Sequence, residues 1–187
     1  VKELSNREGV EYVSVIKDNL RFDFDHAYSR IVALPIVPRK IKDKIESFQD
    51  YQFKNESCIY CDMIKQEQNG PRVILDNESF LCLVPFTQTL PFQVVIYPKK
   101  HYTSIEELGE LEIFNLAEAI KSIITRIKAV AKPFKFVMSF QLKPVKEKDF
   151  HFHVEIAQKT YQSSMAEGYH LNLVKISPEE TSKILRG

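Results

Sequence analysis

The chain has 187 residues, of which 44% are hydrophobic and 27% charged, a balance typical of a globular protein rather than a disordered one. Its net charge of +1 argues against a nucleic-acid-binding module, because such modules usually carry a larger basic excess. No apolar run approaches the roughly 20 residues needed to cross a bilayer, and the N-terminus lacks the apolar core of a signal peptide. We therefore expect a cytoplasmic protein without a membrane or nucleic-acid partner.

The first 56 residues predict two short strands and a connecting segment. The strand-like runs lie at 11–16 and 29–37, and Pro35 interrupts the second. Residues 39–55 are polar and charged, with scattered aromatic residues. We interpret them as a connecting segment, with or without a short helix, that lies over another part of the protein.

From residue 57 onward the pattern predicts an α+β unit. Apolar residues recur every three or four positions over 110–131, which predicts the main helix, and Pro133 ends it. Ser177 and Pro178 have the order of an N-cap and a first helical residue, which predicts a last helix. Strands are expected at 73–75, 80–84, 92–97, 134–142, 150–158 and 169–176, and a helical region opens at 104–108. This order predicts an antiparallel sheet backed by helices over residues 57–187, preceded by an arm and connecting segment over 1–56.

The stripe predicted to face the core on the main helix is broad. Its members are Ile113, Leu116, Ala117, Ile120, Ile123, Ile124 and Ile127. Intervals of three and four residues bring side chains to the same side of a helix.

Cys58 and Cys61 form a C-x-x-C pair at the start of the unit. Three cysteines do not make a disulfide framework, so we expect a reducing compartment, where such a pair is more often a metal site. Two thiolates can hold one Zn²⁺, which then needs two more ligands. The same spacing occurs in thiol-redox motifs, although their thioredoxin-like βαβ setting is not predicted here, and also in unrelated structural cysteines.

Three titratable residues, His151, His153 and Glu155, alternate along the predicted strand at 150–158. Alternate residues of a strand share a face, so these three should point one way. Their apolar neighbours should point into the core; these are Phe150, Phe152, Val154 and Ile156. Three titratable side chains on one strand face are unusual for an ordinary solvent-exposed surface, so they indicate a functional site. The alternative is that the two histidines are simply exposed surface residues. His101 follows a predicted strand beside two lysines, and by itself it is either a ligand or a surface residue.

Taken in order, these landmarks resemble the galactose-1-phosphate uridylyltransferase family of the histidine-triad superfamily. The resemblance joins the C-x-x-C pair, the segments 84–92 and 97–101, and the string His-Phe-His-Val-Glu at 151–155. The end of the chain, from residue 168 to 180, also resembles the end of that family. Members consist of two similar fused halves, each a small antiparallel sheet with a helix. The resemblance therefore implies a histidine-triad-like α+β second half at 57–187, and the end of a first half at 1–56.

The resemblance also implies the roles of the candidate site residues. One structural Zn²⁺ would be held by Cys58, Cys61, His101 and His151. In this superfamily, the histidine two places after the first one of the motif attacks the α-phosphorus of a nucleotide, which makes His153 the candidate nucleophile. Glu155 takes the substrate-binding position, where active halves usually carry glutamine. A carboxylate there would repel phosphate unless it is protonated or paired.

The end of the first half departs from the family's pattern. The family usually carries His-Pro-His, whereas this chain has His26, Ala27 and Tyr28. Tyr28 therefore stands in place of the family's nucleophile, and Arg30 stands where glutamine is expected.

The predicted function is that of a nucleotidyltransferase of galactose metabolism. It would move a nucleoside monophosphate between a nucleotide sugar and a sugar 1-phosphate or phosphate. The alternative, favoured by Tyr28 and Glu155, is a non-catalytic, zinc-stabilised domain that binds a nucleotide or a partner chain. Halves of this family pack against each other, so we expect a homodimer or pairing with a second half-domain.

Overall fold

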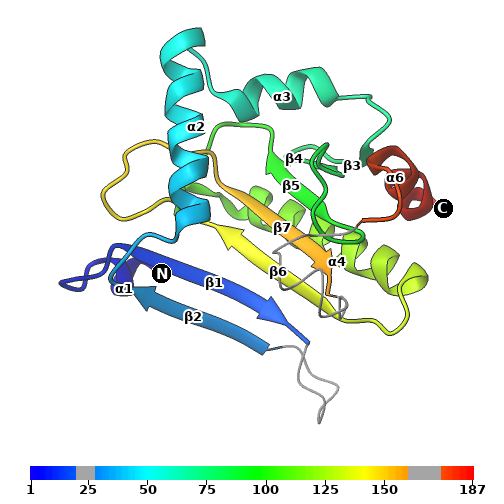
Figure 1. Ribbon diagram of the computed structural model, residues 1–187, viewed down its shortest axis with the longest axis horizontal. Coiled ribbons are helices and arrows are strands. Elements are labelled where there is room, and N and C mark those ends of the chain that lie inside the picture. The colour runs from blue at the N-terminus through cyan, green and yellow to red at the C-terminus, as the bar shows by residue number, and fades with distance from the viewer. Residues whose placement is uncertain (20–27, 160–173) are drawn as a thin grey trace.

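A seven-stranded antiparallel sheet runs through the computed structural model, which describes residues 1–19, 28–159 and 174–187 (Figure 1). The strand order is β2-β1-β6-β7-β5-β4-β3, and each neighbouring pair is antiparallel. The elements are α1 (Lys2–Ser5), β1 (Tyr12–Asp18), β2 (Tyr28–Leu34), α2 (Arg39–Asn55), α3 (Ile59–Glu67), β3 (Val73–Asp76), β4 (Phe80–Leu83), β5 (Val94–Pro98), η1 (Ile105–Glu107), α4 (Glu110–Val130), β6 (Phe136–Gln141), β7 (His153–Gln158) and α6 (Pro178–Arg186).

Side-chain alternation along the strands gives the sheet two buried faces. On β4, Phe80 and Cys82 belong to the core that α4 and α6 cover. Leu81 and Leu83 point the other way and pack against Ile64 of α3. Figure 1 shows α4 behind the sheet, opposite α2 and α3. The central strands are therefore buried on both faces.

The buried stripe of α4 is narrower than predicted. Leu116, Ala119 and Ile123 are buried, together with Ile127 one turn later, whereas Ile113 is 54% exposed. At 100° per residue, position 113 lies about 60° away from position 116 around the helix. The sheet covers only one side of α4, so Ile113, at the edge of the predicted stripe, faces solvent.

The two N-terminal strands extend the same sheet. β1 and β2 form an antiparallel pair, as the apolar runs predicted. β1 also pairs with β6, with Val15 opposite Phe140. The division of the chain into an arm and a domain at residue 56 stays a prediction.

Residues 39–55 lie over another part of the protein, as predicted. They form one 17-residue helix, α2, where a connecting segment with at most a short helix was expected. Its buried residues are Ile41, Ile45 and Phe48, spaced by four and three positions. The remaining positions are mostly charged or polar, so the low average hydrophobicity concealed an amphipathic helix. Ile41 and Ile45 pack with Tyr12 and Phe150, which seats α2 on the sheet.

The last helix begins as its sequence predicted. The Ser177 hydroxyl accepts a hydrogen bond from the backbone N–H of Glu180 at 3.1 Å, and Pro178 is the first helical residue. The strand expected at 169–176 lies mostly outside the described residues, and 174–176 are not a strand. His26 also lies outside them. Among the helices that the structure describes, none combines the length and apolarity needed to span a bilayer.

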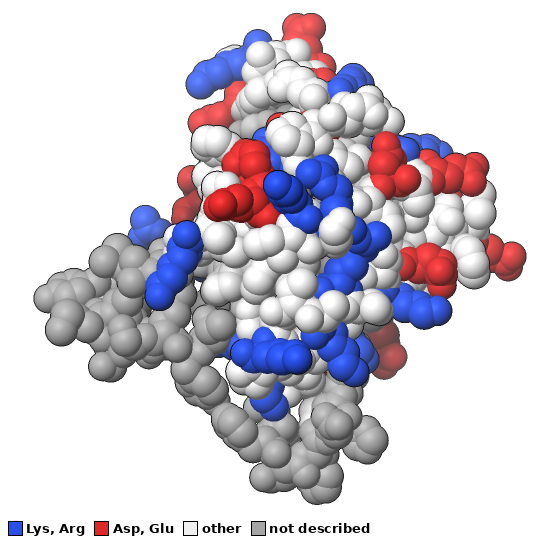
Figure 2. All heavy atoms as spheres, turned by 90° about the vertical axis from the view of Figure 1, so that its right-hand side faces the viewer, with Lys and Arg blue, Asp and Glu red and all other residues white. Residues whose placement is uncertain are grey.

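Charge is unevenly spread despite the small net value. Figure 2 views the side on which α6 lies in Figure 1, and lysine and arginine side chains gather across its middle. One arginine near α6 has a structural role. Arg126 of α4 donates hydrogen bonds to the carbonyl oxygens of Leu185 and Arg186, at 2.8 and 2.9 Å. Because the last carbonyls of a helix lack partners within it, this guanidinium stabilises the end of α6.

Candidate functional site

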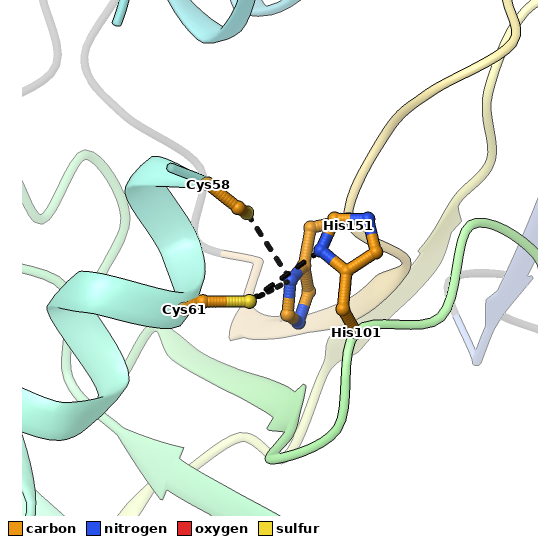
Figure 3. Close-up of side chains that lie close together, drawn as sticks. All are labelled: Cys58, Cys61, His101 and His151. Atoms are coloured by element: carbon orange, nitrogen blue, oxygen red, sulfur yellow. Dashed lines mark hydrogen bonds between the residues drawn. The ribbon is translucent and has the colours of Figure 1, made fainter. Parts of the chain in front are cut away.

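Four side chains from three distant parts of the chain meet near the start of β7 (Figure 3). Cys58 is the N-cap of α3 and Cys61 lies in its first turn, while His101 follows β5 and His151 precedes β7. The Cys61 sulfur is 3.4 Å from Nδ1 of His101 and 3.5 Å from Nδ1 of His151. The Cys58 sulfur is also 3.5 Å from Nδ1 of His151. The four ligand atoms lie within 4.8 Å of one another, so the cluster can hold one metal ion.

Hydrogen bonds on the far side of each imidazole suit it to metal binding. Nε2 of His151 lies 3.0 Å from the carbonyl oxygen of Pro98, which can only accept, so Nε2 carries the proton. Nε2 of His101 lies 3.0 Å from a carboxylate oxygen of Asp149, whose other oxygen accepts a hydrogen bond from Gln52 at 2.8 Å. Both Nδ1 atoms are thereby left facing the sulfurs, in the arrangement that orients metal-binding histidines.

Burial keeps the two thiols and the His151 imidazole uncharged when no metal is bound. It raises the pKa of the Cys61 thiol to about 12, and it also raises the pKa of Cys58. It lowers the pKa of His151 to about 3. A neutral imidazole is ready to bind a metal, whereas both thiols must first lose a proton. Metal binding should therefore release protons and strengthen as the pH rises.

A cavity of about 700 Å³ hollows the same side of the sheet. His153 of β7 lines it, together with Tyr60 of α3 and Tyr97 of β5. The rings of His151 and His153 both pack against Tyr60, at centroid distances of 5.6 and 5.2 Å, which confirms that these histidines share one face. Phe150, expected on the opposite face, lies on this one, 5.8 Å from the His153 ring. The strict alternation fails there because β7 begins only at His153.

His153 is held in one orientation by the backbone carbonyl of His151. Its Nδ1 lies 2.8 Å from the carbonyl oxygen of His151, so Nδ1 carries the proton and Nε2 keeps its lone pair. The side chain is 1% exposed, and burial lowers its pKa. Nζ of Lys44 lies 3.3 Å from Nε2. The ring therefore presents a neutral, nucleophilic nitrogen that a lysine covers.

Glu155 is ionised and paired. Burial alone would raise its pKa, but the contact with His153 and the positive charge of Lys44 outweigh burial and bring the pKa to about 2. Nζ of Lys44 lies 2.5 Å from Oε1 of Glu155. Lys44 was not predicted as a site residue, because residues 39–55 were interpreted as a connecting segment. The spacing of Ile41, Ile45 and Phe48 was the signal that could have revealed α2.

Tyr28 lies on a different part of the sheet. It is the first residue of β2, opposite Asp18 of β1. β1 and β6 separate β2 from β7, and Tyr28 is not among the described residues that line the cavity. Arg30 forms an ion pair with Asp18. The structure thus separates Tyr28 and Arg30 from His153.

Residues 44–171 match the family model described as galactose-1-phosphate uridyl transferase, C-terminal domain. The chain belongs to this family. The resemblance predicted from the sequence is confirmed. Galactose-1-phosphate uridylyltransferase from Thermotoga maritima is 27% identical over 99% of this chain and 63% of its own length. ADP-glucose phosphorylase from Arabidopsis thaliana is 21% identical over 100% of this chain and 54% of its own length. The chain therefore spans less than two thirds of the length of these two relatives.

Solved structures confirm the predicted fold class. A uridylyltransferase structure superposes on 99% of this chain and 62% of its own with a TM-score of 0.88 and 26% identity. A zinc-bound histidine triad protein from Mycobacterium smegmatis covers 70% of this chain and 91% of its own, with a TM-score of 0.52 and 15% identity. The second likeness concerns the fold alone. Together they show an α+β, histidine-triad-like sheet in this member of the uridyl transferase family.

Proposed function

We propose that this chain is part of a nucleotidyltransferase that moves a nucleoside monophosphate between a nucleotide sugar and a sugar 1-phosphate or phosphate. Membership of the uridyl transferase family supports the reaction class. The observation that carries the proposal is His153, whose proton is held on Nδ1 by a carbonyl while Nε2 borders a large cavity.

The proposed reaction is two displacements at one phosphorus. Nε2 of His153 attacks the α-phosphorus of the nucleotide sugar, and the bond from that phosphorus to the bridging oxygen breaks. Sugar 1-phosphate leaves with the electron pair, and the nucleotide stays on the imidazole as a phosphoramidate. A phosphate oxygen of the acceptor then attacks the same phosphorus and releases the histidine. Glu155 borders this site as a substrate-binding residue, and its pairing with Lys44 reduces its repulsion of phosphate.

We further propose that Cys58, Cys61, His101 and His151 hold one structural Zn²⁺. Two thiolates and two imidazoles make a closed tetrahedral set, which favours a stabilising role over a catalytic one. The thiol-redox alternative has less support, because the two histidines complete a metal set and the described strands are all antiparallel. The reduced thiols that such a site needs favour a cytoplasmic location.

Labelling with a nucleotide sugar tests the proposed reaction. Incubation with UDP-glucose or ADP-glucose labelled in the α-phosphate should leave an acid-labile, base-stable nucleotide on the protein. His153→Ala should abolish this label and leave the zinc content unchanged, since His151 is the proposed ligand. Glu155→Gln should raise labelling, because an amide donor replaces a carboxylate beside the phosphate. The proposal fails if Glu155→Gln shows neither label above background nor nucleotide binding by calorimetry.

The alternative function is a non-catalytic, zinc-stabilised domain that binds a nucleotide or a partner chain. The position of Lys44 over Nε2 favours it, as does Tyr28 in place of the family's nucleophile. Nucleotide binding in the cavity without any labelling of His153 would establish this alternative.

We also propose that β2 pairs with a second copy of the chain or with a second half-domain. β2 is one edge of the described sheet, and Ile31 and Val32 on it are 51% and 44% exposed. Apolar side chains beside an open strand edge favour pairing with another strand. Light scattering should therefore show a dimer, and Val32→Lys should weaken it. A wild-type chain that stays monomeric at high concentration would count against this pairing.

A further inference from the structure

Lys44 connects helix α2 to the candidate nucleophile across the cavity. Its ammonium contacts three acceptors on β6 and β7, which are Oε1 of Gln141 at 3.1 Å, Nε2 of His153 at 3.3 Å and Oε1 of Glu155 at 2.5 Å. An ammonium has protons and no lone pair, so Lys44 is the donor in each contact. The lone pair with which His153 would attack phosphorus is therefore occupied.

The backbone of Lys44 is fixed, but its ammonium can move. Ile41, Ile45 and Phe48 are buried and hold this part of α2 against the sheet. The Lys44 side chain itself is 30% exposed, and its flexible stem lets the charged end turn toward the cavity. Lys44 thus has a fixed attachment point and a partly exposed charge that borders the cavity.

We propose that Lys44 covers Nε2 of His153 until a phosphorylated ligand enters the cavity and draws its ammonium away from that nitrogen. This inference rests on the proposed function, because it takes the ligand to carry a phosphate. A phosphate competes for the ammonium through charge-assisted hydrogen bonds, whereas a neutral ligand offers no comparable attraction. The cavity would therefore admit neutral molecules without exposing the nucleophile.

Chemical modification of His153 tests, without any nucleotide, whether Lys44 covers Nε2 of His153. Diethyl pyrocarbonate acylates unprotonated imidazole nitrogens, and peptide mass spectrometry gives the rate at His153. Glu155→Gln is the reference, because an unpaired carboxylate would otherwise favour protonation of the imidazole once Lys44 is removed. The double variant Lys44→Met/Glu155→Gln should react on the order of tenfold faster, since a hydrogen bond from a charged donor is lost.

Lys40 provides the matched control, because it lies one turn earlier on α2 and also lines the cavity. Lys40→Met/Glu155→Gln should react at the rate of the reference variant. Equal rates with and without Lys44 would overturn the covering, as would equal acceleration by both lysine substitutions.

Calorimetry with UMP tests the role of the phosphate, with uridine as the neutral comparison. Lys44→Met should weaken UMP binding by about tenfold or more and leave uridine binding unchanged, whereas Lys44→Arg should retain most of the UMP affinity. Unchanged UMP binding by Lys44→Met would overturn the inference. Failure of the wild type to bind UMP would instead contradict the proposed function, and the modification rates would still decide whether Lys44 covers His153.

Discussion

Cys58→Ala should leave the purified protein without its metal and largely unfolded at ambient temperature. The proposed Zn²⁺ joins the start of α3, the segment after β5 and the segment before β7, which are otherwise distant in the chain. Binding of a structural zinc contributes roughly 10–16 kcal/mol in small zinc domains, whereas the total stability of a domain is about 5–15 kcal/mol. Elemental analysis should find about one zinc per wild-type chain, and thermal unfolding followed by circular dichroism measures the loss.

Cys82 is the matched control for this substitution. It is a fully buried cysteine on β4, it is not part of the metal cluster, and it packs as the small hydrophobic residue that its surroundings predicted. Cys82→Ala should keep the zinc and cost on the order of 1 kcal/mol, because only one buried sulfur is lost. A metal-free wild-type protein with an unchanged melting temperature would refute the structural role of zinc.

Phe48→Ala should lower the free energy of unfolding by about 3–5 kcal/mol, the usual cost of removing a buried phenylalanine. Phe48 is 1% exposed and its ring lies 6.3 Å from that of Tyr60 and 6.4 Å from that of Phe150. It therefore joins α2 to α3 and to the segment that precedes β7. Urea unfolding of the wild type and the variant gives the difference.

Phe53 is the matched control, because it is a phenylalanine on the same helix that does not pack in the core. It is 89% exposed, so Phe53→Ala should change stability by no more than about 0.5 kcal/mol. Similar losses for the two variants would show that Phe48 does not join α2 to α3 and to the segment before β7. Lys44 lies one turn before Phe48 on α2. Phe48→Ala, unlike Phe53→Ala, should therefore also weaken UMP binding in the cavity.

Several features could be predicted from the sequence because local patterns specify them. The places of β1 to β7 along the chain, the span of α4 and the start of α6 follow from apolar periodicity and from capping residues within a few positions of each other. The four residues of the metal cluster were predicted through the family resemblance, and the structure brings their ligand atoms together.

Other features depended on contacts between residues far apart in the chain. Residues 39–55 carry few apolar side chains, and only the packing of Ile41 and Ile45 against Tyr12 and Phe150 makes their helical spacing significant. Nothing in the local sequence distinguishes Lys44 from the other charged residues of 39–55. Its partner Glu155 lies 111 residues away in the chain. Periodicity and capping are local and can be read from the chain, whereas a salt bridge across a cavity exists only once the tertiary structure has brought α2 over β7.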